Sequence, residues 1–158
     1  MSTSETSGLV TDMAGLPDHV GAHLGYTEWQ VMDQERVNQF ADVTDDHNSI
    51  HVDVERAKAS PFGGTVAHGY LTLSLVAPIT TQLLRVTDVV AGVNYGLDRV
   101  RFPAPLRVGA QWRGSAEIVA VNEVPGGMQV KLKATVEVKG SDKPALVAER
   151  LLRLFGGA

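Results

Sequence analysis

The second half of the chain alternates between apolar and polar positions. From Met128 to Val138 every second residue is apolar, and the residues between are polar or charged. A period of two is typical of a strand with one face on the core and the other in water. The pattern therefore predicts a strand over 128–138, entered through a Pro-Gly-Gly turn. We expect its neighbours to be strands over 112–121 and 145–155, and one or two strands over 89–102, broken near Gly96.

The middle of the chain has a different pattern. Apolar residues leave almost no polar face between Gly69 and Leu84, which indicates a buried helix, and Pro78 is expected to kink it. Earlier, the spacing predicts a strand over 26–32, a helix over 34–43 capped by Asp33, a loop over 44–50, and a short helix over 54–59 capped by Asp53. Together these elements predict an α+β fold in which an antiparallel β-sheet wraps around one long central helix.

Length and composition narrow the possible classes. The 158 residues suit one domain, and the 44% of apolar residues can form its core. We expect a flexible N-terminal tail over 1–12 and a single domain over 13–158. The absence of cysteine excludes disulfides, thiolate metal sites and a cysteine nucleophile. A formal charge of −4 without a basic cluster argues against nucleic acid, and no apolar segment is long enough for a membrane span, so we expect a cytoplasmic protein.

Candidate chemistry is concentrated in the loop from Thr44 to His51. Asp46 and His51 stand five residues apart across an irregular turn, where a carboxylate and an imidazole can converge on one small volume. Such a pair suits general acid–base catalysis. Gly69 begins the apolar helix, where a free backbone N–H can stabilise a developing oxyanion. The sequence therefore supplies a candidate water-holding pair and a candidate oxyanion donor.

Two segments resemble the MaoC-like, (R)-specific enoyl-CoA hydratase family. They read F-A-D-V-T-D-D-H-N-S-I-H-V-D over 40–53 and A-H-G-Y over 67–70. A third, N-Y-G-L-D-R-V-R-F-P-A-P-L over 94–106, is similar to a mycobacterial-type branch of that family. The family motif reads roughly S/T-G-D-x-N-P-L/I-H, and the resemblance extends over about 20–155, nearly the whole chain.

The resemblance implies a single hotdog domain and a hydratase or dehydratase acting on acyl thioesters. Asp46 and His51 match the catalytic pair, and Gly69 matches the glycine that binds the thioester carbonyl. Asn48 matches the motif asparagine, which either holds the loop or contacts substrate. Tyr95 either lines the substrate pocket or packs on the sheet. We expect no metal or redox cofactor, a substrate carried as a CoA or acyl-carrier-protein thioester, and a homodimer that covers the open sheet edge.

Two positions depart from the motif. Asp45 replaces its glycine, and Ser49 replaces its proline. Asp45 places a second negative charge beside Asp46, and it lacks the freedom of glycine to adopt a positive φ. These departures bear on the reaction rate and pH optimum more than on the reaction class.

Three alternatives stay open at this point. A metal could bind His47 and His51 with Asp42 and Asp46, but the stretch is loop-like and no third ligand of fitting type is obvious. The fold also occurs in acyl-CoA thioesterases that use a lone carboxylate. A non-catalytic acyl-binding subunit is the third alternative, which the two motif departures favour.

Overall fold

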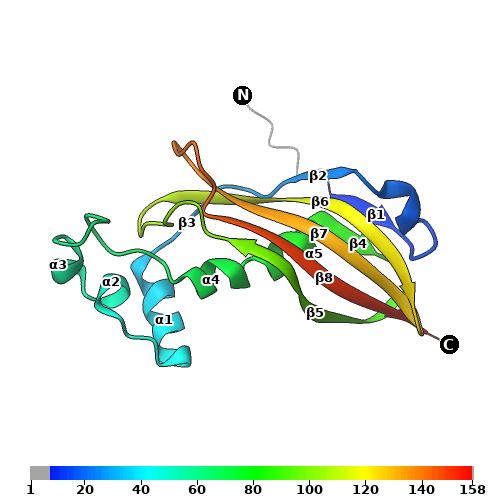
Figure 1. Cartoon of the computed structure of the whole chain (residues 1–158), viewed down its shortest axis with the longest axis horizontal. Helices are drawn as coiled ribbons and strands as arrows, with labels where there is room; N and C mark the ends of the chain where they lie inside the picture. The colour runs from blue at the N-terminus through cyan, green and yellow to red at the C-terminus, as the bar shows by residue number, and fades with distance from the viewer. Residues whose placement is uncertain (1–7, 158) are drawn as a thin grey trace.

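One curved antiparallel sheet forms most of the molecule (Figure 1). The computed structural model describes residues 8–157. The sheet has the order β2-β6-β7-β8-β5, with the short β3 also paired to β6. Its strands are β2 His23–Tyr26, β3 Gln30–Val31, β5 Val89–Arg101, β6 Gln111–Val124, β7 Gly127–Val138 and β8 Leu146–Gly156. β6, β7 and β8 confirm the predicted strands. β5 is a single strand, and its register with β8 is irregular between Asn94 and Gly96.

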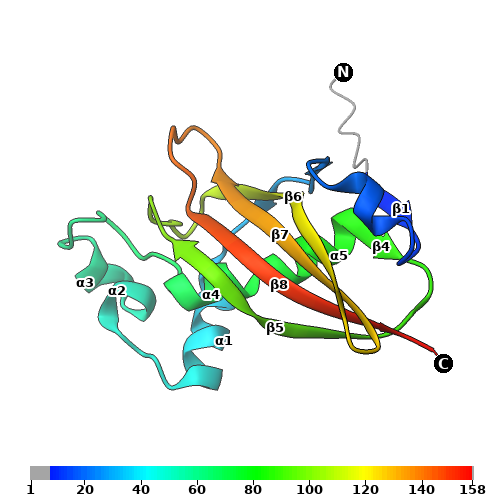
Figure 2. The same cartoon turned by 45° about the vertical axis from the view of Figure 1, so that its right-hand side comes forward.

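The central helix lies against the concave face of this sheet, as Figures 1 and 2 show. Ile79 and Leu83 of the helix are fully buried against core residues of the sheet such as Ile118 and Leu132. The predicted arrangement, a sheet wrapped around a helix, is therefore present. It places the start of the helix beside the loops of the first half of the chain.

The central helix differs from the prediction in two respects. It is divided into α4 Gly69–Ser74 and α5 Val76–Leu83 at Leu75. The ring of Pro78 clashes with the carbonyl four residues earlier, that of Ser74, which accounts for a break there rather than a mild kink. The helix is also not buried all round, because Tyr70 on its outer side is 73% exposed. The sheet covers one side of the helix only.

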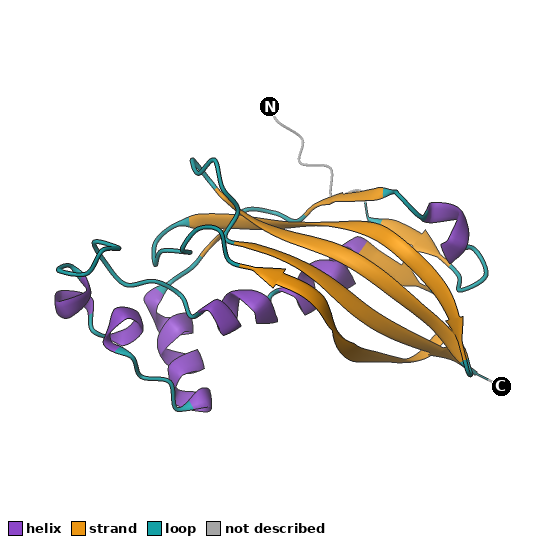
Figure 3. Cartoon of the chain, viewed as in Figure 1, coloured by secondary structure: helices purple, strands orange, loops and turns teal. Residues whose placement is uncertain are grey.

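The first half of the chain forms short helices beside the sheet (Figure 3). They are α1 Gln34–Thr44, α2 Ser49–Val52 and α3 Val54–Ala57, with a 3-10 turn η1 over Leu16–His19. Asp33 caps α1 by accepting from the Arg36 N–H at 2.8 Å, and Asp53 caps α3 by accepting from the Arg56 N–H at 2.9 Å, as predicted. The predicted loop over 44–50 ends earlier than expected, where α2 begins. The predicted strand over 26–32 is two short strands instead.

The N-terminal segment also differs from the prediction. Leu9–Thr11 form β1, which pairs in parallel with β4, Leu84–Val86. The prediction of a flexible tail over 1–12 is therefore wrong for residues 9–11, and residues 1–7 lie outside the described range. The partner strand lies 75 residues away in sequence, and three residues carry no periodic pattern that would reveal it.

Within residues 8–157, no helix has both the length and the apolar character needed to cross a bilayer. The cytoplasmic location stays a prediction.

Candidate active site

Three titratable side chains converge where the predicted loop meets the central helix. One carboxylate oxygen of Asp46 and one ring nitrogen each of His51 and His68 all lie within 4.8 Å of one another. Asp46 is exposed, whereas His51 and His68 are 8% and 2% exposed. The predicted pair therefore does meet, and His68, which was not among the predicted site residues, joins it.

The loop geometry explains how the departures from the motif are accommodated. Asp45 follows the end of α1 with φ 58° and ψ 21°, in the left-handed region. Among the described residues it is the only non-glycine with a positive φ. The backbone thus keeps a conformation that glycine adopts freely, and Asp is one of the few other residues that tolerates it. Ser49 is the first residue of α2, a position that proline favours but does not require.

His51 is oriented by a hydrogen bond on the inner side of its ring. Its Nδ1 lies 2.7 Å from the Val66 carbonyl oxygen, which only accepts, so Nδ1 carries the proton and Nε2 is left as an acceptor. Burial lowers the pKa of His51 most, and the neighbouring His68 lowers it further. The Val66 carbonyl and the Asp46 carboxylate oppose this by raising the pKa. The net shift is downward, which favours a neutral imidazole able to take a proton.

His68 connects the two halves of the site. Its Nε2 donates to the backbone carbonyl of Asp46 at 2.9 Å, and its ring stacks on His51 with centroids 3.8 Å apart. This hydrogen bond holds the Asp46 loop against the start of the central helix. Its Nδ1 is buried and has no partner among the described residues. The only sequence signal was its place directly before Gly69.

A cavity of about 310 Å³ opens beside this cluster. Its walls include His51, Gly69, Thr72 and Phe102, together with the apolar segment 103–106. Gly69 is the first residue of α4, so its N–H has no acceptor within the helix. Among the described residues, its N–H also donates no backbone hydrogen bond outside the helices and strands. A β-carbon at this position would lie 3.5 Å from the Phe102 ring. Because no β-carbon stands between its backbone and the Phe102 ring, the glycine leaves its N–H open to the approach of a carbonyl group.

Of the predicted site residues, His51 and Gly69 line this cavity, whereas Asp46, Asn48 and Tyr95 are not among its lining residues. Asn48 caps α2 by accepting from the Ile50 N–H at 3.3 Å, which is the loop-holding alternative. Tyr95 is 55% exposed, and the Arg153 guanidinium lies 3.4 Å from the centre of its ring, so the structure does not bring Tyr95 to the site.

The metal set considered from the sequence does not assemble. His47 turns away and pairs with Asp42 at 2.8 Å on the surface. The donors that do converge are Asp46, His51 and His68. The missing third candidate ligand was His68, seventeen residues beyond His51, which only the fold brings close.

The comparisons with known proteins agree with the fold and the motif. The family model for the MaoC like domain matches residues 16–140. The chain is 46% identical over 142 residues to 3-hydroxyacyl-thioester dehydratase Z of Mycobacterium tuberculosis, covering 89% of this chain and 94% of that protein. It is 42% identical over 139 residues to nodulation protein N of Rhizobium leguminosarum bv. viciae, with 86% of each chain covered.

Among solved structures, an (R)-hydratase from A. caviae superposes with a TM-score of 0.71, at 22% identity, over 85% of this chain and 96% of that one. This neighbour supports the hotdog fold. The match of the family model over most of the chain, together with the two relatives above 40% identity, settles the family: the chain belongs to the MaoC-like domain family.

Proposed function

We propose that the protein is an (R)-specific enoyl-CoA hydratase, or 3-hydroxyacyl-thioester dehydratase in the reverse direction. The convergence of Asp46 with His51, which lines the same cavity as Gly69, carries this proposal. The name of the Mycobacterium tuberculosis relative, a dehydratase of 3-hydroxyacyl thioesters, supports the reaction class.

In the proposed mechanism one water is held between the Asp46 carboxylate and Nε2 of His51. The water oxygen forms a bond to C3 of a trans-2-enoyl thioester, and a proton reaches C2 on the same face. Because water gives up one proton and C2 gains one, the reaction balances without any other reactant. Two side chains on one side of the substrate favour this syn addition. The (R) configuration at C3 requires that the water meet one particular face of the double bond, and we propose that face from the family motif that Asp46 and His51 match.

The Gly69 N–H is proposed to bind the thioester oxygen. Addition at C3 places negative charge on that oxygen in an enolate-like transition state. A backbone donor fixed at the start of a helix stabilises such charge without reorganising. The space beside Phe102 gives the thioester room to lie against the donor.

We propose that the reaction needs no metal or redox cofactor, because hydration changes no oxidation state and the two side chains supply the proton transfers. Dialysis against a chelator is expected to leave the hydration rate unchanged. Loss of activity that added Zn²⁺ restores would instead assign Asp46, His51 and His68 to a metal site.

The decisive assay follows the loss of enoyl absorbance with trans-2-enoyl-CoA thioesters of increasing length, with chiral analysis of the product. Formation of the (R)-3-hydroxy product is expected, and the absence of any absorbance change would refute the proposal. Release of free thiol from a saturated acyl-CoA would favour the thioesterase alternative, since hydration leaves the thioester intact.

We also propose a homodimer. β5 pairs with β8 on one side only, so its other edge is open within the described chain. Side chains along this strand are unusually exposed for apolar residues, Val90 at 75% and Val93 at 47%. An open edge with exposed apolar side chains favours pairing with a second copy.

A further inference from the structure

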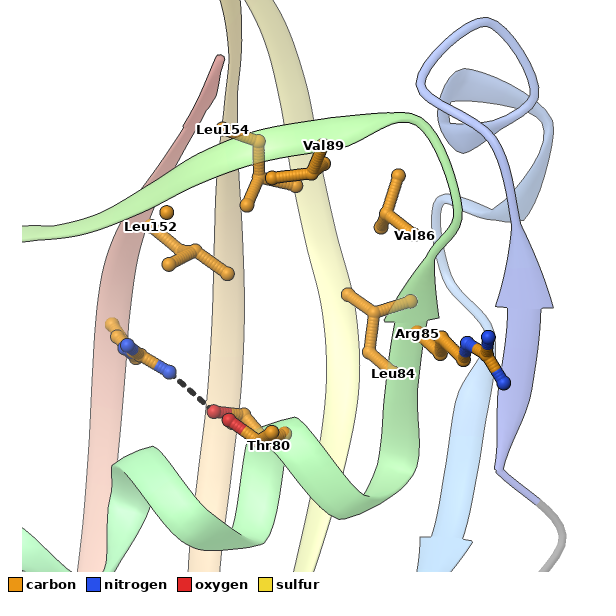
Figure 4. A pocket seen from close by; sticks show the side chains of 10 residues that line it. Thr80, Leu84, Arg85, Val86, Val89, Leu152 and Leu154 are labelled. Carbon is orange, nitrogen blue, oxygen red and sulfur yellow. Dashed lines mark hydrogen bonds between the residues drawn. The ribbon is translucent and has the colours of Figure 1, made fainter. Parts of the chain in front are cut away.

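A buried arginine lies on the inner face of β8, away from the candidate active site. Arg150 is 8% exposed, its Nε donates to Asn94 Oδ1 at 3.2 Å, and its Nη1 donates to Thr80 Oγ1. Figure 4 shows the bond to Thr80 spanning the space between β8 and α5. None of the ion pairs among residues 8–157 involves Arg150.

This environment leaves the cation incompletely satisfied. Burying a charge is unfavourable unless an opposite charge and hydrogen bonds compensate it, and here both acceptors are neutral oxygens. A guanidinium has five N–H donors, of which these two bonds engage two. Arg150 can therefore still donate to an anionic group that arrives from outside the chain.

Arg150 lines two cavities. One, of about 200 Å³, is bounded by helix residues and by Asn94 and Leu97 of β5. The other, of about 440 Å³, has mainly apolar walls, and Figure 4 shows Leu84, Val86, Val89, Leu152 and Leu154 around it. Arg85 also lines that cavity, but its side chain points away toward β1 (Figure 4). Arg150 is thus the one cation directed between these apolar walls.

The two cavities and the candidate active site follow the same side of the central helix. Gly69 lines the active-site cavity, Leu73 and Val76 line the middle one, and Thr80 lines the largest. Gly69 and Leu73, four residues apart, lie on one face of α4, and Val76 and Thr80, also four apart, lie on one face of α5. Thr80 is eleven positions after Gly69, so the distance along the two helices is at most roughly 16 Å at ~1.5 Å per residue.

We infer that Arg150 binds a carboxylate at the far end of the acyl chain, so that the preferred substrates are ω-carboxy-2-enoyl thioesters. This inference rests on the proposed function and deepens it. The thioester would lie at Gly69 and the aliphatic chain against Leu73, Val76 and Leu97. An extended chain advances ~1.2 Å per bond, so a chain of about 10 to 14 carbons spans the distance.

The test compares pairs of trans-2-enoyl-CoA thioesters of about 8 to 14 carbons that end in either a carboxylate or a methyl group. The wild-type kcat/KM is expected to favour the carboxylate at the matching length by about 10- to 150-fold, the range for a hydrogen bond to a charged group. Equal or better turnover of the methyl-ended compounds at every length would overturn the inference.

Arg150→Met, which removes the cation but keeps the length of the side chain, is expected to abolish this ratio. Arg150→Lys retains the charge without the planar fork and is expected to preserve part of it. Arg153→Met is the matched control on the outer face of the same strand, and its ratio is expected to equal that of the wild type. Two results would show that Arg150 is structural. One is an equal loss of kcat/KM on carboxylate-ended and methyl-ended substrates, and the other is dissociation of the proposed dimer while the ratio of the two kcat/KM values stays unchanged.

Failure of this inference can be separated from failure of the proposed function. Wild-type turnover of crotonyl-CoA, too short to reach Arg150, reports on the proposed reaction alone. If crotonyl-CoA is not hydrated, calorimetric binding of saturated acyl-CoA pairs still tests the pocket. Tighter binding of the carboxylate-ended compound, lost in Arg150→Met, supports the inference, and equal binding of both compounds refutes it.

Discussion

At the residue scale, the proposed chemistry depends on which nitrogen of His51 is free. The Val66 carbonyl fixes the proton on Nδ1, and stacking on His68 holds the ring in place. In the proposed mechanism Nε2 would therefore be the base, and the exposed Asp46 would share the water with it. Neither side chain alone provides both a positioned water and a route for its proton.

Asp46→Asn and His51→Gln are each expected to lower kcat by at least ~100-fold, the usual contribution of a positioned acid–base group. Initial rates on crotonyl-CoA and circular dichroism measure activity and fold. His47→Gln is the matched control, because His47 is exposed and pairs with Asp42 rather than with the site. Near-native turnover in either site variant would refute the proposed roles.

The pH profile provides a second prediction. Because burial lowers the pKa of His51, Nε2 stays unprotonated to a lower pH than an ordinary histidine does. The acid limb of kcat/KM is therefore expected below the ordinary histidine range of about 6.5, with activity lost as the pH falls through it. The free energy of unfolding is expected to change in the same direction. As the pH drops, His51 takes up its proton in the unfolded chain before it does so in the folded protein, so stability falls between the unfolded-state pKa and the folded-state pKa. A limb above the ordinary range would contradict a neutral, buried His51.

At the element scale, the active-site loop depends on the left-handed residue that follows α1. Asp45→Gly is expected to stabilise the protein by about 0.5–1 kcal/mol, because the β-carbon penalty of roughly 1–2 kcal/mol in this conformation exceeds the cost of about 0.4–1 kcal/mol for the greater unfolded-state entropy of glycine. Chemical denaturation measures the change, and Asp45→Ala is the comparison expected to destabilise. A destabilised glycine variant would mean that the Asp45 side chain makes a compensating interaction.

A substitution at the start of α4 is expected to lower activity without lowering stability. Gly69→Ala adds a β-carbon at an ordinary contact distance from Phe102, so the fold is expected to survive. The same methyl group occupies space where the thioester would lie, and a displacement of ~1 Å can cost ~100-fold in rate. We expect at least a tenfold loss of kcat/KM at unchanged melting temperature. Gly64→Ala, with no atom within 4 Å of the new methyl group, is the control, and its activity is expected to be unchanged.

The elements that sequence could predict are those whose signal is local. The alternation over 128–138 defined β7, and Asp33 and Asp53 marked the starts of α1 and α3. The pairing of β1 with β4 was missed because its contacts join distant segments. The same reason explains why Asp46 and His51 could be identified from a local motif, whereas His68 and Arg150 could not.

At the scale of the whole molecule, the described chain has one face that its own sheet does not cover. The open edge of β5 lies near the outer side of the central helix there, since both elements line the cavity of about 200 Å³, and Tyr70 on the helix is 73% exposed. The three cavities follow the helix on this side as well. Association of two copies through this face would therefore cover both the open edge of β5 and the acyl path, by which we mean the proposed course of the acyl chain from Gly69 to Arg150.

Light scattering after size exclusion is expected to give twice the mass of one chain. Val93→Lys places a charge on the open edge, a device by which proteins prevent strands from pairing, and is expected to shift the mass toward that of a single chain. Val119→Lys, on the interior strand β6 with Val119 38% exposed, adds the same charge away from the open edge of β5 and is expected to stay dimeric. If the dimer encloses the acyl path, Val93→Lys also lowers kcat/KM for long enoyl thioesters more than for crotonyl-CoA.

A wild-type protein that has the mass of one chain at every concentration would refute the association, and a dimer insensitive to Val93→Lys would place its interface elsewhere.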